Sequence, residues 1–505
     1  MKRNFKNLLV ITLTSLMIVS CTTDFLEVDP KGLDVEANYY KNEEEAFAGL
    51  VATYDVLRKN SGGFENMITM FNAGSDDHYA GGGSDSDGAG IQSFSNYTIN
   101  TNTVPDSFFS DYYKGIYRAN LLLSKLPNVP MDDDKKALFA AESRVLRAYY
   151  YFNLVRMFKN VPLILEPISA SQFYTVTQDA PEDVYAQIEL DLTESIDLLP
   201  MTATGDDAGR LTQGSARAIL GKVYLYQGKN SQAATQFAEV NGTPGGVSQY
   251  GYQLLTSFNS LWDFSNKFNS ESVLEVSHSA QGSYWGIWGG SADEGNTINV
   301  MVGPRNYTQV NSTAPALPSG WSFNVFTQDF MDFMGSDPRL NATVFNILPF
   351  EAYAQSINPN NHAYIGGYQD TGYFLNKFLP KQANVYSGPG DSVLNYSQNT
   401  YAIRLADTYL MEAEALGGTG TRAQALLDAV RTRVGLASVP VSLAAIKDER
   451  RRELAGEGHR WFDLVRWGDA PTVLGSRGFV AGKHEVLPIP FRELDGTQLV
   501  QNPNY

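Results

Sequence analysis

In this chain of 505 residues, histidine, serine, glycine and acidic residues do not occur in the patterns of known catalytic or metal-binding motifs. The five histidines, at positions 78, 278, 362, 459 and 484, are never spaced as metal ligands. Gly289–Asp293 lacks the last glycine of a nucleophile elbow, and Gly81–Gly83 lacks the lysine and serine that end a phosphate-binding loop. Carboxylates are numerous, but no sequence feature selects a glycosidase pair. The sequence therefore predicts no catalytic residue, no metal site and no cofactor.

The residues that do suggest chemistry are aromatic rings placed next to polar side chains in loops. Sugars offer C–H faces that stack on aromatic rings, and hydroxyls that pair with carboxylates, amides and guanidinium groups. We predict ligand contacts at three loop clusters: Asp76, Asp77 and Tyr79; Tyr284, Trp285 and Trp288; and Trp321. Packing in the core is the alternative for the tryptophans, and a capping or turn role is the alternative for the two aspartates.

Two further loop segments are weaker candidates. Tyr364, Tyr368 and Tyr373 lie in another aperiodic stretch and are possible stacking residues. Ser84–Gly88 contains a fragment of a calcium-binding loop but lacks the later glutamate ligand. We therefore expect a solvated acidic loop at Ser84–Gly88.

The single cysteine, Cys21, indicates a different kind of chemistry. Basic residues at the start of the chain precede the apolar stretch Leu8–Val19, which is too short to remain as a membrane span. Ile18–Cys21 then fits a bacterial lipobox, in which the cysteine thiol is acylated and the chain is cut before it. We predict a signal peptide at residues 1–20 and a lipid anchor at Cys21 that holds the protein on a membrane. A simple secretory signal with an incidental cysteine is the alternative.

Amphipathic helices are the elements that must position these loops. Ala137–Phe158 carries one apolar stripe, with Arg144, Arg147 and Asn153 outside it. A second helix begins at Pro181, whose ring suits the first turn, and it ends before Pro200.

The helix pair Thr212–Gly228 and Ser231–Val240 matches the tetratricopeptide consensus. Its signature residues are Leu220, Gly221, Tyr224, Gly228, Ala233 and Phe237. Looser copies occur at Leu405–Val434 and at Leu146–Phe158. Because the copies are scattered along the chain, we expect a helical backing and no continuous solenoid. The aperiodic segments 60–110, 242–325 and 341–400 predict ordered irregular structure that carries the binding site.

The charge balance is acidic, with 55 acidic against 38 basic residues and a net charge of −17. This charge repels nucleic acid and anionic membrane surfaces. We therefore expect no nucleic-acid partner.

Four segments, in this order, resemble the SusD/RagB family of nutrient-binding lipoproteins. They are the lipobox followed by Asp24–Leu26 and Asp29-Pro30; Ala141–Phe152 followed by Val161–Leu163; Glu449–Ala455 followed by Arg460, Asp463 and Arg466–Gly468; and Leu487–Pro490 followed by Gln501–Tyr505. In the third segment, opposite charges recur at spacings of three and four residues, as in Glu449/Arg452/Glu453 and Asp463/Arg466. We predict that they form partly buried ion pairs that fix this helix against its neighbours.

The resemblance implies a mainly α, SusD-like fold, with tetratricopeptide-like helix pairs packed against an irregular, loop-rich, ligand-binding part. We divide the mature chain into an N-terminal region, 21–240, and a C-terminal region, 241–505. The resemblance also implies an outer-membrane lipoprotein facing the cell exterior, which captures a glycan without catalysis and passes it to a SusC-like TonB-dependent transporter. Oligopeptide cargo, as in RagB-like relatives, is one alternative, and a surface glycoside hydrolase or a pure protein scaffold are others.

Overall fold

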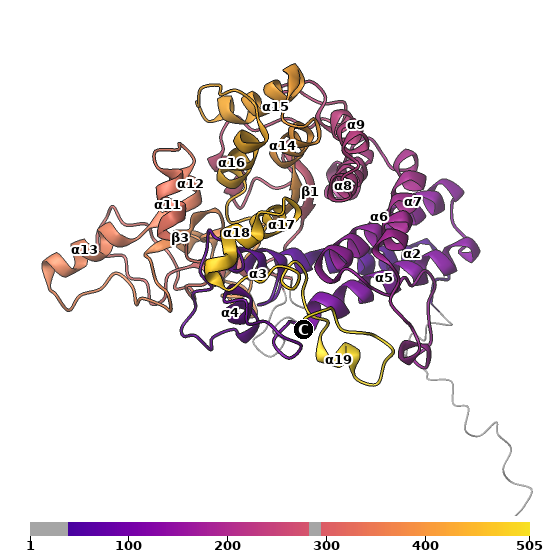
Figure 1. Ribbon diagram of the computed structural model, residues 1–505, viewed down its shortest axis with the longest axis horizontal. Coiled ribbons are helices and arrows are strands. Elements are labelled where there is room, and N and C mark those ends of the chain that lie inside the picture. The colour runs from indigo at the N-terminus through magenta and orange to yellow at the C-terminus, as the bar shows by residue number, and fades with distance from the viewer. Residues whose placement is uncertain (1–38, 282–293) are drawn as a thin grey trace, which may run out of the picture.

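The chain is mainly α-helical, as predicted, in the computed structural model, which describes residues 39–281 and 294–505 (Figure 1). Its larger helices are α2 (Glu43–Tyr54), α5 (Ser107–Lys125), α6 (Asp133–Phe158), α7 (Pro181–Ser195), α8 (Gln213–Tyr226), α9 (Asn230–Asn241), α14 (Leu405–Ala415), α15 (Gly420–Arg433) and α16 (Leu443–Glu453). In these two stretches no helix has the length and apolar character that crossing a bilayer requires.

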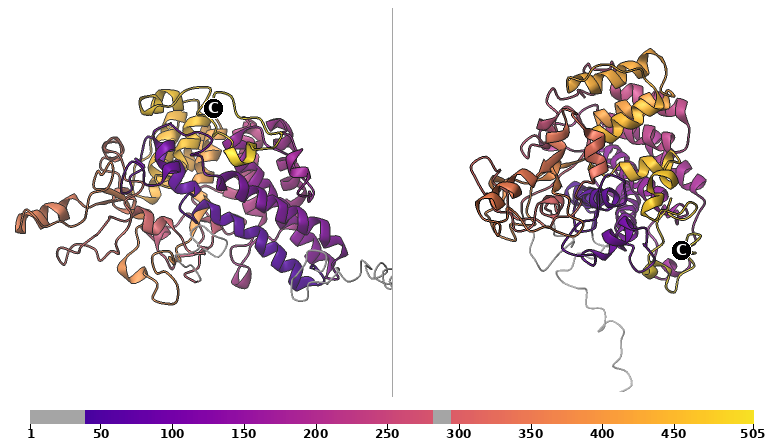
Figure 2. Two further views of the ribbon diagram at one scale, coloured as in Figure 1. Left: turned by 90° about the horizontal axis from the view of Figure 1, so that it is seen from below. Right: turned by 60° about the vertical axis from the view of Figure 1, so that its left-hand side comes forward.

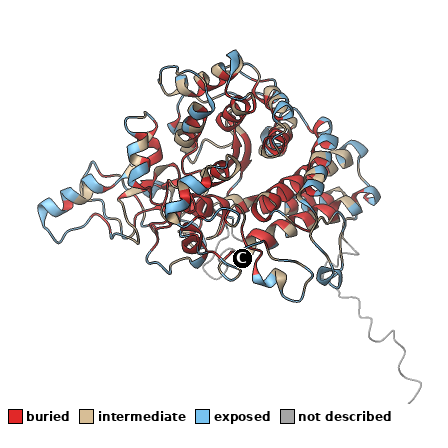
Figure 3. Ribbon diagram, viewed as in Figure 1, coloured by how far each residue is buried: buried red, intermediate tan, exposed pale blue. Residues whose placement is uncertain are grey.

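Helix α6 begins at a strong cap and becomes buried on all sides. The Asp132 carboxylate accepts hydrogen bonds from two first-turn amides, which stabilises the helix start. Most residues of the second half are buried (Figure 3). The expectation that Arg147 and Asn153 lie outside the buried face is wrong, since they are 6% and 0% exposed. Arg147 can be buried because it donates to both carboxylate oxygens of Asp191 on α7, at 2.8 and 2.7 Å.

The tetratricopeptide-like pair has the close packing that its small residues predict. The Thr212 side chain caps α8 in a reciprocal arrangement with Ser215. A Cβ added at Gly221 would lie 2.7 Å from the Phe237 ring of α9, so the two helices approach as closely as a glycine allows. Gly228 then adopts a φ of +71° in the turn between them.

The helices form one uninterrupted row, although their sequences are scattered. Consecutive neighbours are α5, α6, α7, α8, α9, α14 and α15, and α9 packs directly on α14 despite the long insertion between them. Figure 1 shows this row as an arc from α5 at the right to α15 at the top. The helical backing is as predicted, and the insertion between α9 and α14 leaves the row and returns to it, so the helices are neighbours in space without being consecutive in the sequence. Helices from both sides of residue 240 share one hydrophobic core.

The irregular part lies on the other side of the molecule and contains short elements. They are α3 (Met67–Ala73), α4 (Ala89–Ser95), α10 (Ile298–Val302), α11 (Gln328–Met334), α12 (Leu340–Thr343), α13 (Leu348–Ile357), α17 (Arg460–Arg466) and α18 (Ala470–Leu474). The last short helix, α19 (Phe491–Leu494), lies beside α5 instead (Figure 1). Strand β1 (Ser272–Val276) pairs antiparallel with β4 (Thr400–Arg404), and β2 (Val344–Asn346) pairs antiparallel with β3 (Tyr373–Leu375). Helix α13 projects from the body at the left of Figure 1, and both views of Figure 2 show the same separation of helical and irregular parts.

Short 3₁₀ helices complete the described elements. They are η3 (Asp55–Asn60), η4 (Leu126–Asn128), η5 (Gln172–Tyr174), η6 (Ile196–Leu198), η7 (Gly205–Asp207), η8 (Asn259–Trp262), η10 (Asn376–Phe378), η11 (Gln382–Asn384) and η12 (Gly475–Arg477).

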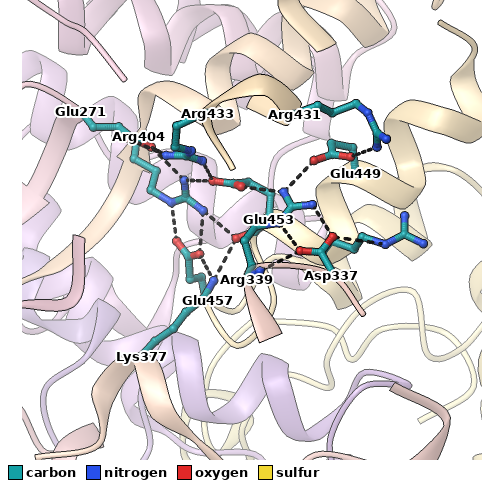
Figure 4. A network of polar contacts seen from close by, with 11 residues as sticks. Glu271, Asp337, Arg339, Lys377, Arg404, Arg431, Arg433, Glu449, Glu453 and Glu457 are labelled. Atoms are coloured by element: carbon teal, nitrogen blue, oxygen red, sulfur yellow. Dashed lines mark hydrogen bonds and ion pairs between the residues drawn. The ribbon is translucent and has the colours of Figure 1, made fainter. Parts of the chain in front are cut away.

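A network of buried charges joins α16 to the irregular part (Figure 4). The Glu453 carboxylate accepts from Arg339 at 2.8 Å, from Arg404 at 2.6 Å and from Arg433. Glu449 accepts from Arg339 at 2.6 Å. These side chains are almost fully buried, and their arginines come from distant parts of the chain. The predicted role of the signature, to fix the helix against its neighbours, agrees with these contacts.

The individual pairs predicted within the signature are only partly correct. Arg466 does bind Asp463, at 2.8 Å and three residues away. Arg452 instead lies 3.8 Å from Asp337, with its guanidinium over the Phe333 ring. The glutamates of α16 point into the core, where arginines of other elements reach them, whereas Arg452 lies nearer the surface.

Candidate functional site

Asp76 and Asp77 lie in an internal ion-pair cluster. Both Asp76 oxygens accept from Arg460, at 2.8 and 2.9 Å, and Asp77 accepts from Arg451 at 2.7 Å. Burial and the adjacent Asp76 raise the pKa of Asp77 to about 6. Burial opposes ionisation of Asp76 too, but Arg460 and Arg451 outweigh it and lower the pKa of that carboxyl. Asp77 is 1% exposed, and Asp76 is partly exposed with both oxygens bound to Arg460, so arginines of the protein itself engage both carboxylates.

Tyr79 and Trp321 come from loops that the structure places side by side. The Tyr79 amide donates to the Val325 carbonyl at 2.9 Å, and the Asn324 amide donates to the Ala80 carbonyl at 2.9 Å. These bonds align the two segments antiparallel, although His78 and Asn324, which lie in them, are 246 residues apart in the sequence. Tyr79 is partly exposed and packs in a small cluster beside the main core.

Trp321 forms an aromatic pair with a residue that the sequence did not single out, Phe64. Their ring centres lie 6.4 Å apart at an angle of 45°. The buried Phe323 ring supports Phe64 edge to face at 5.1 Å. Both Phe64 and Trp321 are partly exposed, so a ligand in solution can reach the pair while the buried Phe323 ring packs against Phe64.

An arginine and a carboxylate border this pair. The Arg305 guanidinium donates to Asp87 Oδ2 at 2.7 Å and to the Trp321 carbonyl at 3.0 Å. Asp87 also accepts from the Gly83 amide at 2.7 Å. The Arg305 and Asp87 side chains are each about one-third exposed, at 31% and 33%. We call Phe64, Trp321, Arg305 and Asp87 the aromatic face.

A polar pocket of about 260 Å³ lies beside Phe64, which is one of its lining residues. Arg58, Lys114 and Asp111 line it, together with the backbone of Gly62 and Gly63. It therefore presents charged donors and acceptors beside an aromatic ring, a combination that suits ligands rich in hydroxyl groups.

The segments that flank residues 282–293 lie next to the aromatic face. His278 Nε2 and Ser61 Oγ are 2.6 Å apart, and the Gly63 amide donates to Thr297 Oγ1 at 3.1 Å. The Ser279 amide donates to the Glu294 carbonyl at 3.0 Å. The predicted ligand residues Tyr284, Trp285 and Trp288 lie outside the described residues, as does Cys21.

The weaker tyrosine candidates are divided by the fold. Tyr364 is buried and donates to Asp370 at 2.5 Å, whereas Tyr368 and Tyr373 are partly exposed. The Tyr368 amide donates to the Gly82 carbonyl at 2.8 Å, which places its loop against the segment of Asp87. Asp87 itself is paired with Arg305.

Reversible binding is the chemistry that this arrangement can perform. Within residues 39–281 and 294–505, no group of three or more His, Cys, Asp and Glu side chains is placed to hold a metal ion. Stacked rings and a guanidinium–carboxylate pair provide apolar contact and hydrogen bonding, which are the contacts that reversible binding requires. The sequence could not indicate Phe64 or Arg305, because both lie in aperiodic segments and acquire their role only through contacts with Trp321.

Comparisons with known proteins agree with this architecture. The profile of the SusD family matches residues 324–485, and a profile described as "Starch-binding associating with outer membrane" matches residues 24–225. Among curated relatives, a SusD-like protein of Formosa agariphila is 25% identical over 533 residues, covering 95% of each chain.

Solved structures are similar over almost the same length. A laminarin-binding SusD-like protein is 62% identical, with a TM-score of 0.90 over 92% of this chain and all of the other. Surface glycan-binding protein A from Bacteroides thetaiotaomicron, solved in complex with laminarihexaose, is 25% identical with a TM-score of 0.81 over 92% of this chain and all of the other. The order of signature segments, the helical row and these matches lead to one conclusion: this chain belongs to the SusD family.

Proposed function

We propose that this protein is a cell-surface lipoprotein that binds a glycan of the laminarin type and delivers it to a SusC-like TonB-dependent transporter of the outer membrane. The observation that carries the proposal is the partly exposed Phe64–Trp321 pair bordered by Arg305 and Asp87. It occurs on a fold whose 62%-identical solved relative is a laminarin-binding protein.

Glucose rings suit the aromatic face for a simple reason. Each ring has apolar C–H faces and an equatorial set of hydroxyls, so one side chain can stack while its neighbours accept and donate hydrogen bonds. Arg305 supplies donors and Asp87 supplies an acceptor, and each partly neutralises the other. A neutral glycan is therefore favoured over a strongly charged one, in agreement with the net charge of −17.

The anchor and the partner belong to the same proposal. Cys21 would carry the acyl chains, and the transporter would lie beside the tethered protein, so modest affinity would suffice for capture. Labelling with a radioactive or alkyne fatty acid tests the anchor, because Cys21→Ala should abolish incorporation. Co-purification with a transporter from outer membranes tests the partner, and its failure with the acylated protein would remove the delivery step.

Calorimetry tests glycan binding directly. Laminarihexaose should bind, and Trp321→Ala should weaken binding by about 1 kcal/mol, roughly fivefold, since one stacking contact is lost. Tyr353→Ala is the matched control, because this tyrosine is 43% exposed on α13, away from the aromatic face. Melting temperatures must show that both variants remain folded.

Different cargo would give a different result in the same experiment. A mixture of oligopeptides that binds while laminarihexaose does not would replace the proposal with peptide capture. Release of reducing sugar from laminarin by the purified protein would identify a hydrolase instead.

A further inference from the structure

A second pocket lies between the α7–α8 connection and the segment that leads into β1. It has a volume of about 240 Å³ and shares no lining residue with the aromatic face. Thr202, Thr204 and Gly251 are exposed at its mouth, and Tyr250 and Tyr252 are buried in its wall at 4% and 9% exposure. A volume below the range of about 300–1,000 Å³ for whole drug-sized ligands indicates room for part of a larger ligand.

Phe268 lines this pocket in a strained conformation. Its φ is +49°, in the left-handed region that aromatic residues rarely adopt. The backbone is held there because its amide donates to both Glu275 carboxylate oxygens, at 3.0 and 2.9 Å. Glu275 Oε1 in turn accepts from the side-chain Nδ2 of Asn399 at 2.7 Å. Strain that the surroundings maintain at a pocket is a feature of functional sites.

The strained backbone determines where the Phe268 ring lies. The ring packs over Gly209, where an added Cβ would come within 2.6 Å of it. Phe268 is nevertheless only partly buried. The conformation thus keeps an aromatic face at the pocket instead of in the core.

The charged side chains Arg210 and Glu275 that line the pocket are engaged by partners within the protein. Arg210 lines it, but its guanidinium is bound to the Glu142 carboxylate and to Asp207 at 2.6 Å. Hydroxyl groups of Thr202, Thr204 and Ser272 also line the pocket. A ligand with hydroxyls and no net charge fits this lining better than an anion or a cation.

We infer that this pocket is a second saccharide-binding site, in which Phe268 stacks on a sugar ring and the threonine hydroxyls and Arg210 contact its hydroxyls. The inference rests on the proposed glycan binding but concerns different residues. The two sites are separate, because no residue of the aromatic face lines this pocket. Strand β1 lines the pocket as far as Glu275, and His278, which contacts Ser61 beside the aromatic face, follows three residues later. At a rise of about 3.3 Å per residue, this path is about 10 Å.

Phe268→Gly is the informative variant, because glycine accepts a positive φ and removes only the ring. Phe268→Asn is a second variant of the same design, since asparagine also tolerates this region. Both should retain the melting temperature of the wild type within a few degrees and bind laminarihexaose roughly threefold or more weakly at one of two sites. Phe268→Tyr keeps the ring and should bind as the wild type does, and Tyr353→Ala serves again as the control.

Calorimetry with laminarihexaose, on the wild type and on Trp321→Ala, Phe268→Gly and the double variant, separates the possible outcomes. Two sites in the wild type, with one lost in each single variant and both lost in the double variant, support the inference. One site that Trp321→Ala weakens and Phe268→Gly does not would overturn the inference and leave the proposed function intact. A loss only in Phe268→Gly would support the pocket and overturn the aromatic face as platform. No saccharide binding in any protein, or oligopeptide binding that Phe268→Gly removes, would overturn the inference.

Discussion

His278 is a buried histidine that links the strand β1 to the aromatic face. It is 3% exposed, and its ring contacts Ser61 Oγ at 2.6 Å and the Glu294 carbonyl at 3.1 Å. Burial, together with the positive charges of Lys267 and Arg58, lowers its pKa to about 4. The imidazole therefore stays neutral in the folded protein at pH values where an unfolded chain already binds a proton.

This lowered pKa predicts a loss of stability in mild acid. An unfolded histidine takes up a proton as the pH falls through about 6.5, but His278 in the fold does so only near pH 4. The free energy of unfolding should therefore fall as the pH is lowered from 6.5 to 4 and be unaffected by this group above 6.5. His278→Gln should reduce the difference in unfolding free energy between about pH 7 and pH 5 by roughly 1–2 kcal/mol, measured by urea denaturation. His362→Gln, at an exposed position, is the control, and an unchanged difference in His278→Gln would contradict the argument.

Single residues of the site were predictable only where their type was informative. Trp321 stood out as a tryptophan in a glycine- and proline-rich loop, and the structure pairs it with Phe64. Asp76 and Asp77 stood out equally, yet their partners Arg460 and Arg451 lie almost 400 positions away. The neighbouring sequence does not distinguish a carboxylate that faces a ligand from one that binds an arginine distant in the chain.

At the scale of elements, the close approach of α8 and α9 depends on Gly221. A methyl group there would lie 2.7 Å from the Phe237 ring, and both helices are held by other contacts of the row. Gly221→Ala should therefore lower the free energy of unfolding by about 1–3 kcal/mol through overpacking, although alanine is the better helix former. Urea denaturation measures this change.

Gly475→Ala provides the matched control for this substitution. An added Cβ at Gly475 meets no atom within 4 Å, and the backbone there is right-handed, with a φ of −57°. Gly475→Ala should leave the free energy of unfolding unchanged or raise it slightly, because alanine lowers the conformational entropy of the unfolded chain. Equal effects at both positions would show that helix spacing does not depend on Gly221.

Helix boundaries followed from caps and periodicity, whereas the irregular part did not. Pro181 and Thr212 start α7 and α8 as predicted, and α6 ends at the predicted Phe158. Local rules govern these positions. The irregular segments are held by hydrogen bonds such as that from the Tyr368 amide to the Gly82 carbonyl. These bonds join residues far apart in the sequence, so they produce no periodic pattern from which the structure could be predicted.

At the scale of the whole molecule, the network around Glu453 joins the helical row to the irregular part. Arg339 belongs to the segment before α12, Arg404 ends β4, and Arg433 ends α15. All three contact Glu453, which is 0% exposed. The charges are fully desolvated, so each depends on its partners to remain ionised. Burial opposes ionisation of Glu453, but the three arginines outweigh it and hold its pKa well below the usual range.

Glu453→Gln should therefore destabilise the whole protein and not one end of it. The substitution keeps the shape but leaves several buried guanidinium groups with one counter-charge fewer, and breaking a buried ion pair in this way costs about 3–5 kcal/mol. Urea denaturation followed by tryptophan fluorescence and by far-ultraviolet circular dichroism should give coincident transitions, both shifted to lower urea, because residues of both parts contribute to the main hydrophobic core. Glu194→Gln, on the exposed face of α7, should shift neither. Two outcomes would contradict the argument: two separate transitions in Glu453→Gln, or a loss of unfolding free energy no larger than that of Glu194→Gln. Either would mean that the ion pairs around Glu453 do not couple the helical row to the irregular part.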